Sequence, residues 1–265
     1  MQQILIPIIV LGVMGFLFAI ILGIISTKFS VVVDQKEKEV SLALPGANCG
    51  ACGYPGCDAC AHAIATGEAP VEACIVGGKK VADKVAEVMG AVAGDSEKMV
   101  AVVKCNGTCD NAKDNYNYSG IKDCRVQIAL FEGKKACGYG CLGCGTCVEH
   151  CPFDAMYMNN GVAMVDREKC VACGKCVEIC PKDIIKLVPY SQKAVVKCMS
   201  HDKGKDVRGK CKVGCIGCTL CQKTYPEGFE INKFLASEKL DNNLDPQMLK
   251  QAAEKCPNKC IHLYD

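Results

Sequence analysis

The chain begins with an uncharged apolar segment, residues 4–26, that reads ILIPIIVLGVMGFLFAIILGIIS. At about 1.5 Å per residue, a helix of this length reaches across the hydrocarbon core of a bilayer. A cleavable signal peptide fits poorly, because no Lys or Arg precedes the run and the run is too long for such a peptide's apolar region. We therefore predict a single membrane anchor over residues 1–27.

The charges that follow this segment predict its orientation. Lys28, Lys36 and Lys38 all come after the apolar run, and positive charge is enriched on the cytoplasmic side of membrane helices. We expect a single-pass protein of the cell (inner or cytoplasmic) membrane with its soluble domains facing the cytoplasm. Residues 28–46 have mixed charge and are expected to form a stalk.

Beyond the stalk, the hydrophobic pattern predicts short helices and short strands. Residues 56–65 and 79–89 have helical character, the second with apolar residues at 81, 85, 88 and 89. The stretches KMVAVVKC and KAVVKC read as strands that end at Cys105 and Cys198, and GVAMVD suits a hairpin strand. The expected fold class is α+β.

The cysteine content requires an explanation, because 24 of the 265 residues are cysteines. Disulfides, zinc and iron–sulfur clusters are the three explanations. A cytoplasmic location disfavours disulfides. Structural zinc usually takes four ligands from separated CxxC pairs, whereas five cysteines crowd residues 137–151. The sequence therefore favours clusters, and its net charge of +2 gives no reason to expect nucleic acid as a partner.

The strongest motif lies in the centre of the chain. CLGCGTCVEHCP and CVACGKCVEICP both match the C-x2-C-x2-C-x3-C-P run of two-cluster ferredoxins, in which the fourth cysteine of each run binds the other cluster. One predicted [4Fe–4S] ligand set is Cys141, Cys144, Cys147 and Cys180. The other is Cys170, Cys173, Cys176 and Cys151.

A separate cluster is predicted nearer the N-terminus, where glycines between the cysteines allow tight turns. Its ligands would be Cys49, Cys52, Cys57 and Cys74. Cys60 is extra and falls in the expected helix, so we interpret it as a small buried hydrophobic residue.

The last part of the chain resembles a two-cluster ferredoxin that has lost one cluster. Its first run has tyrosine at 225, before Pro226, where the fourth cysteine belongs, and of its second run only Cys256 and Pro257 remain. Under cross-ligation one complete ligand set survives: Cys215, Cys218, Cys221 and Cys256. The lost cluster's space is expected to be filled by Tyr225 and by the apolar residues Phe229, Phe234, Leu235 and Leu249. Cys260 is then a spare cysteine.

One cysteine spacing occurs twice and indicates an internal duplication. Cys124-x12-Cys137-x3-Cys141 is repeated as Cys198-x12-Cys211-x3-Cys215. Cys105, Cys109 and Cys124 lie outside the ferredoxin pattern. They could form a further cluster with Cys137, Cys198 or Cys211, and spacing does not choose among these sets.

No nicotinamide or flavin site and no catalytic side chain are expected on this chain. GYGCLG, residues 138–143, matches G-x-G-x-x-G, which in a dinucleotide site follows a strand and precedes a helix. Here cysteines interrupt and flank the glycines, so we interpret them as part of a cluster loop. The cofactors would carry the redox chemistry.

The apolar N-terminus, the stretch NCGACGYPGCDACAHAIATGEAPVEAC and the tandem ferredoxin runs together resemble the B subunit of the Rnf complex. That complex is a membrane-bound ferredoxin:NAD oxidoreductase that pumps Na⁺ or H⁺. The resemblance covers essentially the whole chain and implies a translocase subunit with at least four [4Fe–4S] clusters. Reduced ferredoxin would be its donor, and membrane and peripheral subunits its partners. Long family members often have no cysteine at the position of Cys144, and there Cys137 is the alternative ligand.

The expected domain order follows from these motifs: anchor 1–27, stalk 28–46, N-terminal cluster domain 47–104, cysteine-containing connector 105–136, two-cluster ferredoxin domain 137–190 and degenerate ferredoxin domain 191–265.

Two other functions compete with the interpretation as an Rnf subunit. A membrane-anchored polyferredoxin of a hydrogenase or heterodisulfide-type complex would have the same motifs. A cluster-based redox sensor would need a recognition domain, which the sequence does not suggest.

Overall fold

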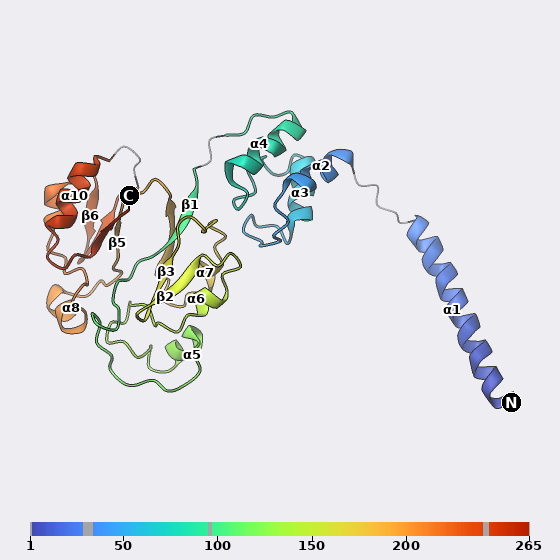
Figure 1. Ribbon diagram of the computed structural model, residues 1–265, viewed down its shortest axis with the longest axis horizontal. Coiled ribbons are helices and arrows are strands. Elements are labelled where there is room, and N and C mark those ends of the chain that lie inside the picture. Colours follow the sequence, from blue (N-terminus) through green and yellow to red (C-terminus); the bar gives the residue numbers. More distant parts are fainter. Residues whose placement is uncertain (1, 29–33, 95–96, 241–243, 265) are drawn as a thin grey trace.

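The computed structural model describes residues 2–28, 34–94, 97–240 and 244–264. The first helix, α1 (Gln2–Lys28), stands apart from the remainder of the fold (Figure 1). Among the residues that the structure describes, no helix meets both the length and the hydropathy of a membrane span. The predicted single-pass anchor is therefore not confirmed.

A small helical domain follows, built from α2 (Gln35–Ala43), α3 (Cys57–Ala65) and α4 (Gly78–Met89). The last two match the helices expected from the sequence. Val40, Ile64 and Val85 are almost completely buried in its core. Helix α2 lies inside the predicted stalk, but because Val40 belongs to this core, the residues around it pack with the N-terminal domain.

The central domain contains two antiparallel strand pairs. Strand β1 (Met99–Val103) pairs with β4 (Ile185–Pro189), and β2 (Met156–Asn159) forms a hairpin with β3 (Val162–Val165). The short helices are α5 (Cys124–Ala129), α6 (Thr146–Glu149) and α7 (Lys175–Ile179). Because β1 pairs with the end of the ferredoxin runs, it belongs to this domain and not to the N-terminal one.

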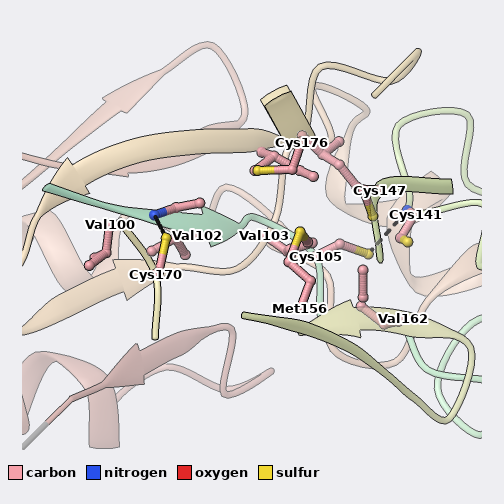
Figure 2. Packing of buried hydrophobic residues seen from close by; sticks show 14 of the residues in the cluster. Val100, Val102, Val103, Cys105, Cys141, Cys147, Met156, Val162, Cys170 and Cys176 are labelled. Carbon is pink, nitrogen blue, oxygen red and sulfur yellow. Dashed lines mark hydrogen bonds between the residues drawn. The ribbon is translucent and has the colours of Figure 1, made fainter. Parts of the chain in front are cut away.

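Valines of β1 and six of the eight cysteines of the two runs share one core. Figure 2 shows Val100, Val102, Met156 and Val162 of this core. Burial of these apolar side chains around the thiols supplies the hydrophobic contribution that a domain this small needs. It also removes the thiols from bulk water.

The C-terminal domain repeats this plan of one outer strand pair and one hairpin. Strand β5 (Ala194–Val196) pairs with β8 (Ile261–Leu263), and β6 (Phe229–Asn232) forms a hairpin with β7 (Leu235–Glu238). The helices are α8 (Gly204–Lys210), α9 (Leu220–Thr224) and α10 (Pro246–Glu254). Figure 1 shows α10 and β6 together at the end of the molecule opposite α1.

The residues expected to replace the lost cluster are mostly buried. Tyr225, Phe229, Leu235 and Leu249 lie in one core, and the Tyr225 hydroxyl accepts a hydrogen bond from the Asp245 amide at 2.9 Å. Phe234 does not join them, because 41% of it is exposed. The apolar replacement therefore includes three of the four expected apolar residues.

Candidate metal centres

All 24 cysteines are free thiols, and five cavities in the described part of the chain are lined by four or five of them each. Neutral thiols are weak hydrogen-bonding groups, so a cavity lined by four of them calls for a ligand.

The N-terminal cavity contains the four predicted cysteines and one more. They are Cys49, Cys52, Cys57, Cys60 and Cys74. The Asn48 side chain accepts a hydrogen bond from the Cys57 amide at 2.7 Å, which fixes the start of α3 beside the cavity. Cys60 is buried in the helical core as expected, but it also lines this cavity. Burial and the nearby Cys52 raise the pKa of the Cys60 thiol to about 12. Cys60 is the one cysteine of this cavity outside the predicted ligand set.

The cavity of the second ferredoxin run matches the predicted ligand set without additions. It is lined by Cys151, Cys170, Cys173 and Cys176. The backbone amide of Ala101, on strand β1, donates to the Cys170 sulfur at 3.3 Å (Figure 2). Strand β1 thus places a hydrogen-bond donor on a predicted cluster ligand, from a segment 69 residues away in the chain.

The cavity of the first ferredoxin run differs from the predicted set in one cysteine. It is lined by Cys124, Cys141, Cys147 and Cys180. Cys144 does not line it; its thiol donates to the buried Gln127 side chain at 3.4 Å and lies beside Cys124. The alternative ligand Cys137 lies in another cavity. Cys124 comes from the predicted connector. The repeated spacing placed it ahead of this run, but it was not among the ligands predicted for this cluster.

The C-terminal cavity contains the predicted set together with Cys260. The lining cysteines are Cys215, Cys218, Cys221, Cys256 and Cys260. The Ala236 amide, on β7, donates to the Cys215 sulfur at 3.4 Å. The Cys260 thiol lies beside Cys215 and Cys256, and its hydrogen bonds lower the pKa of each to about 6. Cys260, interpreted as a spare, is therefore part of this site.

The fifth cavity is lined by cysteines whose partners the sequence spacing left open: Cys105, Cys137, Cys198 and Cys211. Cys105 and Cys198 are buried, and the other two are partly exposed. Of the cysteines that spacing left open, only Cys109 lies outside all five cavities, and it is exposed.

The cysteine thiols that line these cavities are the ligands that iron–sulfur clusters use. Among the described residues, no three His, Cys, Asp or Glu side chains come together closely enough to hold one metal ion. In a cubane cluster each thiolate binds a different iron, so its ligands need not converge on one point. Burial raises the pKa of Cys147 and Cys176 to about 12, and a bound metal overcomes such a shift because coordination deprotonates the thiol.

Three family models match separate parts of the chain. Residues 44–76 match a putative Fe-S cluster family, residues 140–185 a 4Fe-4S dicluster domain, and residues 212–263 a 4Fe-4S single cluster domain of ferredoxin I. These segments contain the cysteines of four of the five cavities, apart from Cys124.

Three curated relatives align over most of the chain. The B subunit of the Na(+)-translocating ferredoxin:NAD(+) oxidoreductase complex of Acetobacterium woodii is 46% identical over 98% of this chain and 78% of its own length. The B subunit of an ion-translocating oxidoreductase complex of Methanosarcina acetivorans is 43% identical over 86% of this chain and 87% of its own. A proton-translocating counterpart from Clostridium ljungdahlii is 42% identical over 81% and 76%.

Proposed function

Because this chain belongs to the family of Rnf-complex B subunits, from ion-translocating ferredoxin:NAD oxidoreductases, we propose that it accepts electrons from reduced ferredoxin and relays them to partner subunits. It is an iron–sulfur electron-transfer subunit of that complex. The ferredoxin donor and the direction of relay are the proposed part.

The observation that carries the proposal is the agreement between cysteine motifs and cavities. The four cavities that correspond to predicted clusters are each lined by at least three of the four cysteines of the expected set. A bound [4Fe–4S] cluster supplies reversible one-electron chemistry. Several such sites in one small chain make an electron path and need no acid, base or nucleophile from the protein.

We assign the ligands as follows. Cys49, Cys52, Cys57 and Cys74 hold the N-terminal cluster. Cys151, Cys170, Cys173 and Cys176 hold one ferredoxin cluster. Cys141, Cys147 and Cys180, with Cys124 in the place that the ferredoxin pattern gives to Cys144, hold the other. Cys215, Cys218, Cys221 and Cys256 hold the C-terminal cluster.

The chain's own contribution is to bury the sulfurs and to aim backbone amides at them. The amides of Ala101 and Ala236 donate to Cys170 and Cys215 in the two domains, each from a strand that packs against its site. Hydrogen bonds to the sulfurs favour the more negative, reduced state and so raise the reduction potential. Burial acts in the opposite direction, because it disfavours added charge.

Membrane attachment through α1 is part of this proposal. The relatives are subunits of ion-translocating complexes, and α1 exposes large apolar side chains, among them Leu11, Phe16 and Leu22. An apolar environment of lipid or of a neighbouring subunit would cover these side chains.

Rapid mixing tests the donor. The purified chain, loaded with clusters and oxidised, is mixed anaerobically with reduced ferredoxin, and the visible absorbance of the clusters is followed. We expect bleaching at a rate that rises with ferredoxin concentration. Full reduction by dithionite with no reduction by ferredoxin would show that another protein is the donor.

A further inference from the structure

The cysteines of the fifth cavity lie outside the three segments that match family models. Its cysteines, Cys105, Cys137, Cys198 and Cys211, all fall outside residues 44–76, 140–185 and 212–263. Counted with its open mouth, the cavity contains about 490 Å³ of empty space, against about 330–390 Å³ for the other four. It is therefore at least as roomy as the sites with cluster motifs.

The four cysteines come from equivalent positions in two repeated halves. The sequence Val-Val-Lys-Cys occurs at the end of both β1 and β5. Its two valines are the last residues of each strand, and its cysteine, Cys105 or Cys198, lies two residues beyond the strand end. Cys137 and Cys211 each begin a C-x2-G-C segment whose last cysteine opens a ferredoxin run. Each half thus contributes one cysteine after a strand and one cysteine before a run.

This arrangement corrects the duplication expected from spacing. The shared x12 interval predicted Cys124 as the counterpart of Cys198, but Cys124 lines the cavity of the first ferredoxin run. Cys105 takes that place instead, because β1 and β5 end beside the same cavity.

The sulfurs face one another across the cavity and receive backbone donors. The position that a Cβ on Gly107 would take lies 3.6 Å from the sulfurs of both Cys105 and Cys211. The Cys141 amide donates to the Cys105 sulfur at 3.4 Å, as Figure 2 shows. The Ser200 amide donates to the Cys198 sulfur at 3.5 Å. Amide donors of this kind surround the sulfurs of bound clusters.

Two buried lysines supply positive charge without a carboxylate beside them. Lys135 and Lys197 line the cavity and are 4% and 6% exposed. In the part of the chain that the structure describes, neither forms an ion pair, and the Lys135 ammonium donates only to the carbonyls of Gly107 and Gly161. Buried charges are normally paired. A cubane cluster with four thiolates carries roughly two negative charges, which would balance the two lysines.

We propose that Cys105, Cys137, Cys198 and Cys211 bind a further [4Fe–4S] cluster between the two ferredoxin-like domains. The residues that open the neighbouring runs contact its ligands, because the Cys141 amide donates to Cys105 and the Cys215 amide donates to Cys198. A cluster here takes one electron from a reduced neighbouring cluster and gives one to the next, so it connects the central and C-terminal sites. The role of this fifth cluster in electron transfer rests on the proposed function. The proposal that the cluster binds here does not depend on that function.

Iron analysis of the complete chain tests the site. The chain and its variants are loaded anaerobically, and iron, sulfide and zinc are measured per polypeptide. Five four-iron clusters predict about 20 irons for the parent chain. Cys105→Ala and Cys198→Ala should each lower this number by about four. The matched control is Cys109→Ala, which removes an exposed cysteine outside the five cavities and should leave the iron number unchanged.

Loss of buried Cys198 could also disturb the adjacent C-terminal site through Cys215. If Cys198→Ala loses more than four irons, the partly exposed Cys211→Ala decides: a loss of about four supports the proposal, and no loss overturns it. Unchanged iron in both Cys105→Ala and Cys198→Ala, or loss of zinc in place of iron, also overturns it. If the parent chain contains about 20 irons but is not reduced by ferredoxin, the proposed donor is wrong. The proposed cluster site is still supported in that case.

Discussion

The sulfurs of Cys256 and Cys260 lie 3.4 Å apart at the edge of the C-terminal cavity. Cys256 precedes a proline, as the last cysteine of a ferredoxin run does. Cys260 is 3% exposed and lies at the start of β8, where it contacts both Cys256 and Cys215. One thiol is therefore placed as a ligand, and the other as a donor to ligands.

These roles predict different results for two alanine variants. Cys256→Ala should lose about four irons per chain. Cys260→Ala should keep its iron but lower the reduction potential of the C-terminal cluster, because a donor to two ligand sulfurs is removed. Iron analysis and a redox titration followed by EPR measure both. Iron loss in Cys260→Ala together with full iron in Cys256→Ala would exchange the two assignments.

The first ferredoxin cluster offers a similar test of Cys124 against Cys144. Cys124 lines the cavity, and its backbone amide donates a hydrogen bond to the Thr146 hydroxyl at 2.8 Å. The Cys144 thiol donates to the Gln127 side chain. We expect Cys124→Ala to lose about four irons and Cys144→Ala to keep them. The reverse result would restore the ligand given by the ferredoxin pattern, and iron loss in both variants would show that each thiol is needed.

In the N-terminal domain, the prediction concerns Cys57 and Cys60. Cys57→Ala should remove one cubane signal from the EPR spectrum and leave the ferredoxin signals intact. Cys60→Ala should keep that signal, because Cys60 packs in the apolar core of the helical domain and all four cysteines of the predicted set remain. Loss of the signal in Cys60→Ala alone would make Cys60 the ligand in place of Cys57.

The apolar replacement of the retired cluster predicts a difference between two phenylalanines on the β6–β7 hairpin. Phe229 is fully buried beside Tyr225, and Phe234 is exposed at the turn. Phe229→Ala should cost about 3–5 kcal/mol of stability by leaving a cavity, and Phe234→Ala less than about 1 kcal/mol. Thermal unfolding of the cluster-loaded chain, followed anaerobically by circular dichroism, compares them. Equal effects would mean that the hairpin does not support this core.

Membrane attachment predicts that removal of residues 1–28 releases the protein into the soluble fraction of broken cells. Lys28, Lys36 and Lys38 further predict that protease added to inside-out vesicles digests the cluster domains. Protection in those vesicles, with digestion in right-side-out vesicles, would reverse the orientation. Release of the full-length chain by high salt alone would exclude α1 as the anchor.

The sequence by itself was sufficient for the parts of the fold that depend on neighbouring residues. The C-x2-C-x2-C-x3-C-P runs predicted the cavity of Cys151, Cys170, Cys173 and Cys176, because the spacing of such a run places its cysteines within reach of one small cluster. Helices α3 and α4 followed from their apolar pattern, and the burial of Tyr225 followed from its place in a broken run.

Only the tertiary structure brought together cysteines that the chain separates. Cys105 and Cys198 share a cavity because β1 and β5 end beside it, and Cys124 joins the first run because α5 packs against Thr146. No spacing rule connects such residues, since their distance in space depends on strand pairing and helix packing far along the chain. The same reason placed α2 with the N-terminal core and Cys260 beside Cys215.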